Sequence, residues 1–482
     1  MTATGLPALE ARLKQDLAYL ELPAKSWVPP RRRDGQAIYD VVVVGAGMCG
    51  LTASAAMINL GIRNIVALDA APAGLEGPWV TFARMRTLRS PKTLTGPALG
   101  LPALTFRAYY EARFGVEAWT ALGKIPRPLW MEYLVWYRRV LDLPVLNETR
   151  LAGLRLLDRD VLELDVATPA GPQRLLTRRL VLANGRDALG GPFVPSVADS
   201  IDRRFWAHSA EAIDFEVLRG RAVGVIGASA SAMDNAATAL EAGAGSVDLF
   251  VRRTKLPRIN KFTGIGSPGV VHGFAGLPDD WKWRFLHYAM AEQTPPPRDS
   301  TLRVSAHANA RFHLGSPLLH LEREGEALRV TTPKGSYGLD FLIFATGFRQ
   351  DLDRRPEFAA FAPHIRLWQD RFSAPDGLDD EELATSPDLG PGFEFQERQP
   401  GTCPMLRHIH CFNHHATLSH GKLAGDIPAV SEGAQRLARS LAQSLFVEDR
   451  NLHYAALQAF DTPELLGDEW QDADPPPRTS GD

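Results

Sequence analysis

The chain has 482 residues, enough for two or three domains with well-buried cores. Its 53 Lys and Arg residues nearly balance 56 Asp and Glu residues, so bulk charge does not indicate a nucleic-acid or membrane partner. Three cysteines are too few for a disulfide framework and favour a reducing compartment, which predicts a cytoplasmic location.

Residues 1–38 predict an N-terminal helical extension and a basic linker, without the basic start and apolar core of a signal peptide. An apolar strand at 40–44 then runs into Gly-Ala-Gly-Met-Cys-Gly and an alanine-rich helix, and another strand follows at 65–70. The uncharged stretch 41–62 is long enough to span a bilayer. Its glycines and polar residues indicate this strand–turn–helix unit instead.

The turn at 45–50 has the spacing of a dinucleotide-binding loop. In such a loop the first glycine allows a tight turn, the second lets the backbone approach a pyrophosphate, and the third lets helix and strand pack closely. Asp69 ends the next strand, where a carboxylate can accept hydrogen bonds from ribose hydroxyls. The unit therefore predicts a nucleotide site that contains Gly45, Gly47, Met48, Cys49, Gly50 and Asp69.

Two aromatic segments follow, at 105–115 and 130–139, and alternating segments at 151–182 predict a meander of strands with a closing strand. The aromatic side chains recur at helical spacing, so they predict packing in the core rather than chemistry. These side chains are Tyr109, Tyr110, Phe114, Tyr133, Trp136 and Tyr137.

The strand–turn–helix pattern restarts at residue 222. Ser229 replaces the second glycine, but its hydroxyl can donate to a phosphate oxygen. Arg252 and Arg253 follow the next strand, where guanidinium groups would pair with the 2′-phosphate of NADP. The alternative is a solvated basic loop. The predicted NADPH site contains Gly227, Ser229, Ala230, Ser231, Arg252 and Arg253.

The acidic end of the first unit suits the adenosine ribose of FAD, and the basic end of the second suits NADPH. Electrons would then pass from nicotinamide to flavin. No C-x-x-C motif follows the first turn, and no cysteine set has iron–sulfur spacing. Molecular oxygen is therefore the simplest acceptor.

Residues 403–420 contain five histidines and two cysteines, but their spacing does not form a zinc pattern, so no metal is predicted. They would line the flavin or substrate pocket, or have a purely structural role. Asp426 and Pro428 then predict the start of a helix, whose positive end would stabilise reduced flavin. Residues 461–482 predict a disordered tail.

From about residue 39 to 445 the chain resembles the class B flavin monooxygenases, which include flavin-containing monooxygenases, Baeyer–Villiger enzymes and amine N-hydroxylases. The resemblance rests on two glycine turns, a flavin-side motif, two inter-domain crossovers and a segment before the last helix. These are Gly45–Gly50, Gly227–Asp234, Glu76-Gly77-Pro78-Trp79, Leu182-Ala183-Asn184-Gly185, Phe344-Ala345-Thr346-Gly347-Phe348 and Gly425-Asp426.

The resemblance implies an α/β fold of two Rossmann-like domains, with an NADP domain at 201–345 inserted between FAD-domain parts at 39–200 and 346–460. It implies an NADPH-dependent monooxygenase that inserts one oxygen atom from O2 into a small organic substrate through a flavin C4a-(hydro)peroxide. It also adds Trp79, Gly425 and Asp426 to the FAD site, Thr346 to the NADP site, and Arg89 as a catalytic residue.

The chain also departs from the family pattern. The family fingerprint around a central histidine survives only as His208-Ser209, so His208 could simply be a hinge residue at a domain junction. Arg89 could instead bind phosphate or form a structural ion pair. Two other functions remain open: an NADPH-dependent flavin reductase or oxidase that passes electrons to O2, a quinone or a partner, and a nucleotide-binding scaffold without turnover.

Overall fold

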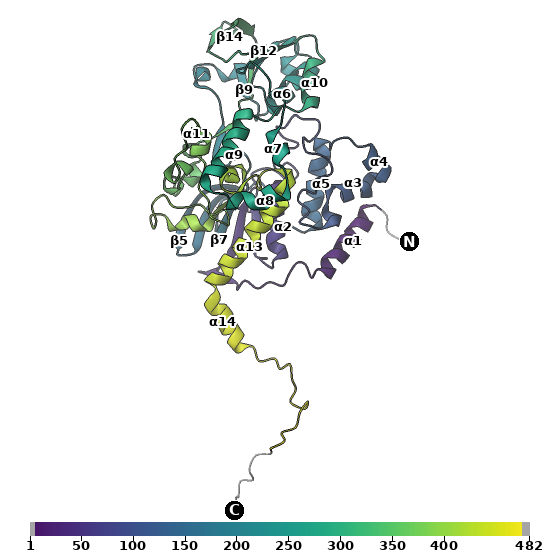
Figure 1. Cartoon of the computed structure of the whole chain (residues 1–482), viewed down its shortest axis with the longest axis vertical. Helices are drawn as coiled ribbons and strands as arrows, with labels where there is room; N and C mark the ends of the chain where they lie inside the picture. Colours follow the sequence, from purple (N-terminus) through teal and green to yellow (C-terminus); the bar gives the residue numbers. More distant parts are fainter. Residues whose placement is uncertain (1–4, 475–482) are drawn as a thin grey trace, which may run out of the picture.

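The computed structural model describes residues 5–474. Its strands form sheets of eight, five, three and two strands, with helices around them (Figure 1). The predicted α/β class is therefore confirmed. The ends of the predicted extension and tail, residues 1–4 and 475–482, lie outside the described residues. Within 5–474, no helix combines the length and the apolar character needed to cross a membrane.

The larger sheet has the order β4-β3-β2-β7-β6-β5, and two short strands join it at β2 and β7. Strands β2, β3, β4, β7 and β18 run parallel, whereas β5 and β6 form the predicted meander with β7. Their bounds are β1 (Arg31–Arg33), β2 (Gln36–Val44), β3 (Ile65–Leu68), β4 (Val145–Leu146), β5 (Arg150–Asp158), β6 (Val161–Thr168), β7 (Gly171–Leu182) and β18 (Ile409–Cys411).

The smaller sheet is parallel throughout and has the order β12-β11-β10-β16-β9. Its central strands are buried, which explains their continuous apolar runs. A separate three-stranded meander packs beside it. The bounds are β9 (Trp206–His208), β10 (Ala222–Ile226), β11 (Ser246–Val251), β12 (Ala310–Leu314) and β16 (Phe341–Phe344), with β13 (His320–Glu324), β14 (Ala327–Thr332) and β15 (Gly335–Leu339) in the meander.

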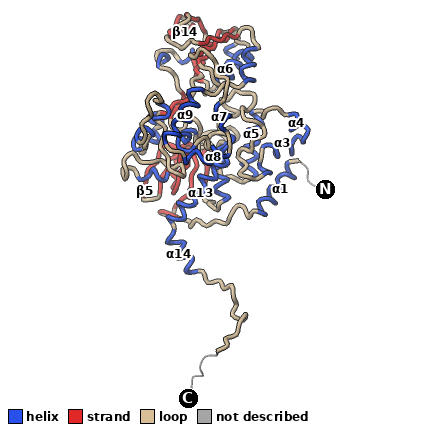
Figure 2. The backbone as a smooth tube through the Cα atoms, in the orientation of Figure 1, coloured by secondary structure: helices blue, strands red, loops and turns tan. Residues whose placement is uncertain are grey.

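Helices surround both sheets (Figure 2). Around the larger sheet, the lower body in Figure 1, α13 packs along α2. Around the smaller sheet, the upper body, α10 packs on α6. The bounds are α1 (Leu6–Tyr19), α2 (Met48–Asn59), α3 (Phe106–Phe114), α4 (Val116–Ala121), α5 (Arg127–Val140), α6 (Ala230–Glu241), α7 (Lys261–Ile265), α8 (Pro268–Gly273), α9 (Asp279–Glu292), α10 (Arg298–Ser305), α11 (Glu381–Ala384), α12 (Thr417–His420), α13 (Val430–Glu448) and α14 (Arg450–Ala459).

The aromatic residues of α3 and α5 form a packed cluster, as their spacing predicts. Tyr133 and Tyr137 are fully buried, and Tyr133 stacks on Trp136 with ring centroids 5.9 Å apart. Phe114 is the exception: its side chain is 46% exposed, because α3 ends there and Gly115 turns the chain with φ of 89°. The core prediction for Phe114 was therefore wrong.

Two short strands connect the sheets. β8 (Gly190–Pro192) follows the larger sheet, β17 (Phe348–Gln350) follows the smaller one, and the two pair antiparallel. All strands of the smaller sheet lie between residues 206 and 344, whereas those of the larger sheet lie at 31–182 and 409–411. The two predicted crossovers, at 182–185 and 344–348, therefore run next to this ribbon.

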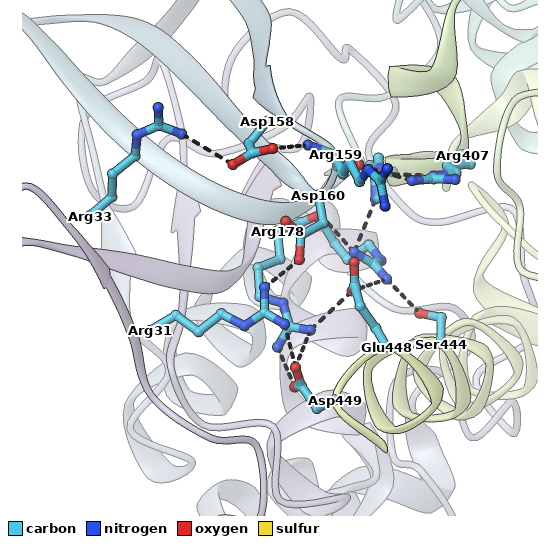
Figure 3. A network of polar contacts seen from close by, with 12 residues as sticks. Arg31, Arg33, Asp158, Arg159, Asp160, Arg178, Arg407, Ser444, Glu448 and Asp449 are labelled. Atoms are coloured by element: carbon cyan, nitrogen blue, oxygen red, sulfur yellow. Dashed lines mark hydrogen bonds and ion pairs between the residues drawn. The ribbon is translucent and has the colours of Figure 1, made fainter. Parts of the chain in front are cut away.

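A buried charge cluster fastens the end of α13 to the larger sheet (Figure 3). Arg178 on β7 is fully buried and donates to Asp449 at 2.7 and 3.1 Å and to Glu448 at 3.0 Å. Arg31 on β1 also contacts Asp449. The predicted basic linker within residues 1–38 is thus partly wrong, because Arg31–Arg33 form a strand whose Arg31 joins this cluster.

Candidate active site

The first glycine turn lies between β2 and α2 and has the backbone that its sequence predicts. Gly45 has φ of 99°, and a Cβ there would lie 2.6 Å from the carbonyl oxygen of Ala183. A Cβ at Gly50 would lie 1.8 Å from the carbonyl oxygen of Gly45. Neither position has room for a side chain, so both glycines are needed for the turn itself.

The second glycine of this turn is different. A Cβ at Gly47 would meet only the Cα of Gly77, at 3.9 Å. Gly47 caps α2 without any side-chain hydrogen bond, so the first N–H groups of the helix are left for another acceptor. An open cradle at a helix N-terminus suits a phosphate group, and the turn therefore fits the pyrophosphate of a dinucleotide.

Asp69 follows the end of β3 and faces this turn. Its carboxylate accepts hydrogen bonds from the backbone N–H groups of Ala46 at 2.7 Å and Ala71 at 2.8 Å. Burial raises the pKa of Asp69, although these N–H groups oppose the shift. Each carboxylate oxygen can accept a further hydrogen bond, so Asp69 can hold the turn and still receive a ribose hydroxyl.

Three predicted flavin-side segments meet at the turn. Gly77 lies against Gly47, and the Trp79 ring packs edge-on against Trp130 with centroids 6.1 Å apart. On the other side, the thiol of Cys49 contacts the backbone of Gly425, and burial raises its pKa to about 12. Met48 is buried as the first residue of α2. The structure thus brings the predicted FAD residues together.

Asp426 is a second acidic group at this site. It pairs with Lys422 at 2.8 Å and lies 3.8 Å from Arg186. Burial works against its charge, but the two cations outweigh burial and lower the pKa of Asp426. A single 3-10 turn at Ile427–Ala429 then leads into α13, so the helix starts slightly later than Asp426 and Pro428 predict.

The predicted catalytic residue, Arg89, lies within electrostatic reach of Asp426. Burial lowers the pKa of Arg89, and the charge of Asp426 opposes that shift. Among residues 5–474 the Arg89 side chain has no hydrogen-bond or ion-pair partner. Lys92, three residues later, is instead committed to the end of α4, where it donates to the carbonyl oxygen of Trp119 at 2.6 Å.

The second glycine turn, between β10 and α6, repeats the construction of the first. Gly227 has φ of 135°, and a Cβ there would lie 2.6 Å from the carbonyl oxygen of Ala345. Ser229 caps α6, is exposed and makes no capping hydrogen bond. Its hydroxyl lies 3.4 Å from that of Ser231, and Ala230 begins the helix between them. The second turn is therefore also open toward a ligand.

The basic residues after β11 are placed differently from each other. Arg252 is exposed and has no side-chain partner within the described part of the chain. Arg253 donates to the carbonyl oxygen of Ala291 at 2.9 Å, at the end of α9. Thr346 lies at the crossover, where its hydroxyl donates to the carbonyl oxygen of Phe193.

Two arginines, Arg84 and Arg303, connect segments of the two sheets, and no sequence motif indicates these contacts. Arg84, from the flavin-side segment, donates to the carbonyl oxygens of Ser209 at 2.8 Å and Glu211 at 2.7 Å. Burial, with the nearby Arg127, lowers the pKa of Arg84 to about 10. From α10, Arg303 donates twice to Glu241 at 2.8 Å and to Asp234 at 3.2 Å. The basic residues at 84–92 were the feature of the sequence that could have indicated the role of Arg84.

His208 ends β9 next to the second crossover. It is fully buried, and its ring centroid lies 5.8 Å from that of Phe348. Its Nδ1 accepts a hydrogen bond from the backbone N–H of Ala210 at 3.1 Å. His208 therefore lies at the junction of the sheets, which is where a hinge residue is expected.

The histidine-rich segment separates into two groups. His408 and His410 contact Arg179 and the carbonyl oxygen of Gly392, away from the glycine turn. His414 lies against Gly425, and His415 accepts from the N–H of Leu189 at 3.4 Å. Among residues 5–474, no three or more His, Cys, Asp or Glu side chains come together as a group that could hold a metal ion.

Asn413 belongs to the site although no motif marks it. It donates to the carbonyl oxygen of Leu182 at 3.0 Å and lies 3.4 Å from the side chain of Asn184. Residues 413–415 follow the carboxyl end of β18, a parallel strand that the sequence did not reveal. The carboxyl ends of parallel strands are common ligand sites, so recognising β18 would have identified Asn413.

We expect these buried histidines to make the protein sensitive to acid. Burial lowers the pKa of His408, His414 and His420 to about 3 and the pKa of His410 and His415 to about 4, so all five are neutral when folded. The unfolded chain binds protons near pH 6.5, and stability is therefore full above that pH and falls as the pH drops toward 4.

Each histidine contributes up to about 1.4 kcal/mol per pH unit to this fall. Urea unfolding at several pH values between about 7 and 5 would measure the slope. His410→Gln should reduce it, whereas the exposed His320→Gln should leave it unchanged. A free energy of unfolding that is constant over this range would contradict the prediction.

No family model matches the chain. The FAD-dependent urate hydroxylase of Xanthomonas campestris pv. campestris is 39% identical to it over 473 residues, which cover 97% of this chain and 98% of that protein. Ornithine hydroxylase from Pseudomonas aeruginosa superposes with a TM-score of 0.68 and 16% identity, over 85% of this chain and 100% of that one. Ornithine N-hydroxylase from Kutzneria, solved with reduced FAD, NADP+ and L-ornithine, superposes with a TM-score of 0.65 and 16% identity. The match covers 84% of this chain and 99% of that one.

Proposed function

Because this chain belongs to the class B flavin-dependent monooxygenases and is an FAD-dependent hydroxylase, we propose that it uses NADPH and O2 to hydroxylate urate or a urate-like purine. One observation supports the binding of two different nucleotides. Both glycine turns have the same open construction, but the first is followed by Asp69 and the second by Arg252. The substrate class is supported by the name of the 39% identical relative.

We propose that the first turn binds FAD. The N–H groups at the start of α2 would bind its pyrophosphate over Gly47, and Asp69 would accept from the ribose. When bound, FAD supplies electron transfer from nicotinamide to O2 and delivery of one oxygen atom. Trp79 and Gly425 would shield the site from water, and Asp426 with Lys422 and Arg186 would set the local charge.

Arg89 is our proposal for the residue that holds the substrate. Urate is a planar anion with several oxygen and nitrogen acceptors, and a guanidinium group is a planar cation with paired donors. Arg89 lies near Asp426, and its guanidinium donors are not engaged by the described residues. It would orient the purine and balance its charge while water is excluded.

The test is a mass balance on the FAD-loaded protein. With urate present, we expect one NADPH and one O2 consumed for each urate lost, and no consumption of ornithine or lysine. The Arg89→Met variant should keep its FAD and oxidise NADPH with release of hydrogen peroxide. It should hydroxylate little urate. If the wild-type protein instead releases hydrogen peroxide equal to the NADPH oxidised and urate is unchanged, the reductase or oxidase alternative is correct.

We further propose that residues 201–345 form an NADP domain inserted between FAD-domain parts at 39–200 and 346–460. The strand positions support this division, because the smaller sheet is continuous in sequence and the larger one is interrupted. Ser229, Ala230 and Ser231 would bind the pyrophosphate of NADPH, and Thr346 would lie at the crossover beside it. Arg252 and Arg253 would bind the 2′-phosphate.

We expect Arg252→Ala to weaken the binding of NADPH but not the binding of NADH. A hydrogen bond to a charged group contributes about 1.5–3 kcal/mol, which corresponds to a rise in the KM for NADPH of roughly 10- to 100-fold. NADH lacks the 2′-phosphate, so its KM should not change. Stopped-flow measurement of flavin reduction with both nucleotides tests this. Arg258→Ala, in the same exposed loop, is the control, and an equal effect on both nucleotides would rule out the assignment.

A further inference from the structure

The C-terminal arm, which we define as residues 450–474, projects from the lower body (Figure 1). It consists of α14 and the segment that follows, and no residue of α14 is buried. Seven large apolar side chains on the arm are 52–78% exposed. They are Leu452, Tyr454, Leu457, Phe460, Leu465, Leu466 and Trp470.

The start of the arm is held in place by aromatic packing. His453 stacks on Phe446 of α13 with ring centroids 4.5 Å apart and an interplanar angle of 13°. Trp27 packs against both rings, at 5.9 and 6.3 Å. The direction in which α14 leaves the body is therefore set, and in Figure 1 it leads away from α5 of the same chain.

A free helix of this kind is unusual. A ten-residue helix is marginal in water by itself and normally depends on packing of an apolar face. Leu452 and Ala456 are spaced four residues apart and so share one face of α14, and Phe460 follows directly after the helix. Soluble monomers rarely leave a continuous apolar surface of this extent uncovered.

The chain also carries an apolar groove that could receive such an arm. It lies on the outer side of α5, has a volume of about 360 Å³, and is lined by Gly74, Val80, Pro128, Met131, Glu132 and Val135. Val80 and Val135 are 36% and 46% exposed, and the neighbouring Leu75 is 41% exposed.

Charge indicates what kind of partner covers the arm. Residues 461–474 contain six carboxylates and no Lys or Arg, which disfavours an anionic membrane or a nucleic acid. The one charged side chain that lines the groove, Glu132, is paired with Arg113. The arm and the groove therefore match in apolar surface.

We propose that a second copy of this chain covers the arm, in a two-fold dimer in which each arm lies in the α5 groove of the other copy. A stable interface buries about 800 Å² on each partner. Three aromatic side chains, at roughly 150–250 Å² each when fully buried, and four leucines bring one arm close to that amount. Because the contact is reciprocal, it is made twice and closes the dimer.

Light scattering on the FAD-loaded full-length protein after gel filtration tests the proposal. The wild-type protein should have twice the 52.9 kDa mass of one chain. Leu457→Asp/Phe460→Asp on the arm, and Val135→Glu in the groove, should each give the mass of one chain, with FAD content and thermal unfolding unchanged. Gln458→Asp, an exposed polar position on α14, is the matched control and should remain dimeric.

Three results would overturn the proposal. If the wild-type protein stays monomeric over a range of micromolar concentrations, the arm is covered by another partner. If an arm variant remains dimeric, the arm is not part of the interface. If the Val135→Glu variant remains dimeric, the groove is not part of the interface. Val80→Glu, in the loop on the other side of the groove, repeats this test if Val135→Glu does not fold.

Discussion

Gly47→Ala is expected to fold normally and to lose FAD. The added Cβ meets no protein atom closer than 3.9 Å, so the chain itself accommodates it. It would occupy the space in which a pyrophosphate approaches the first N–H groups of α2. Loss of two charge-assisted hydrogen bonds, at about 1.5–3 kcal/mol each, would weaken FAD binding by roughly 100-fold or more.

Flavin absorbance of the purified variant, a titration of its apoprotein with FAD, and thermal unfolding of the apoprotein measure the two effects separately. Gly50→Ala should behave oppositely and fail to fold, because its Cβ would lie 1.8 Å from the carbonyl oxygen of Gly45. Gly338→Ala, on β15 with open space around it, is the control. Normal FAD affinity in Gly47→Ala would mean that the turn does not bind the pyrophosphate.

Arg178→Met is expected to destabilise the protein strongly without touching the proposed substrate. The variant leaves Asp449 and Glu448 as carboxylates at the end of α13, where the helix dipole also disfavours negative charge. Removal of one partner from a buried ion pair costs about 3–5 kcal/mol. Arg31 still contacts Asp449, so we expect a value near the lower end of that range.

Urea unfolding followed by circular dichroism gives the free energy for this comparison. The control is Arg33→Met, which removes a half-exposed cation 3.8 Å from Asp158 in the same region. Its effect should stay within about 0.5 kcal/mol. If Arg178→Met lowers the free energy of unfolding by less than about 1 kcal/mol, the prediction is contradicted. Arg31 by itself would then be enough to balance the charge of Asp449.

The two strand–turn–helix units could be predicted closely from sequence, because local patterns determine them. Apolar runs, glycine positions and alanine-rich helices placed β2, α2, β10 and α6 within a few residues of their observed bounds. The same local signals predicted the first FAD residues as a set. Their positions follow from one turn and the two elements that flank it.

The remainder depends on contacts between distant parts of the chain. Arg178 and Asp449 are 271 residues apart, and neither has a local pattern that indicates the other. β1 and β18 are three-residue strands, defined by pairing with a neighbour and too short for an alternating pattern. Arg84 and Arg303 likewise clamp segments that only the fold brings together.

The order of strands along the chain also constrains how the protein is made. The core under the smaller sheet uses residues 218–345 and can close as soon as this segment leaves the ribosome. The core of the larger sheet combines residues 9–189 with residues 358–445, including β18 and α13. The first half of that core must therefore wait, with apolar surface exposed, while residues 218–345 fold. FAD binding can become complete only after β18 and α13 have been synthesised and have packed.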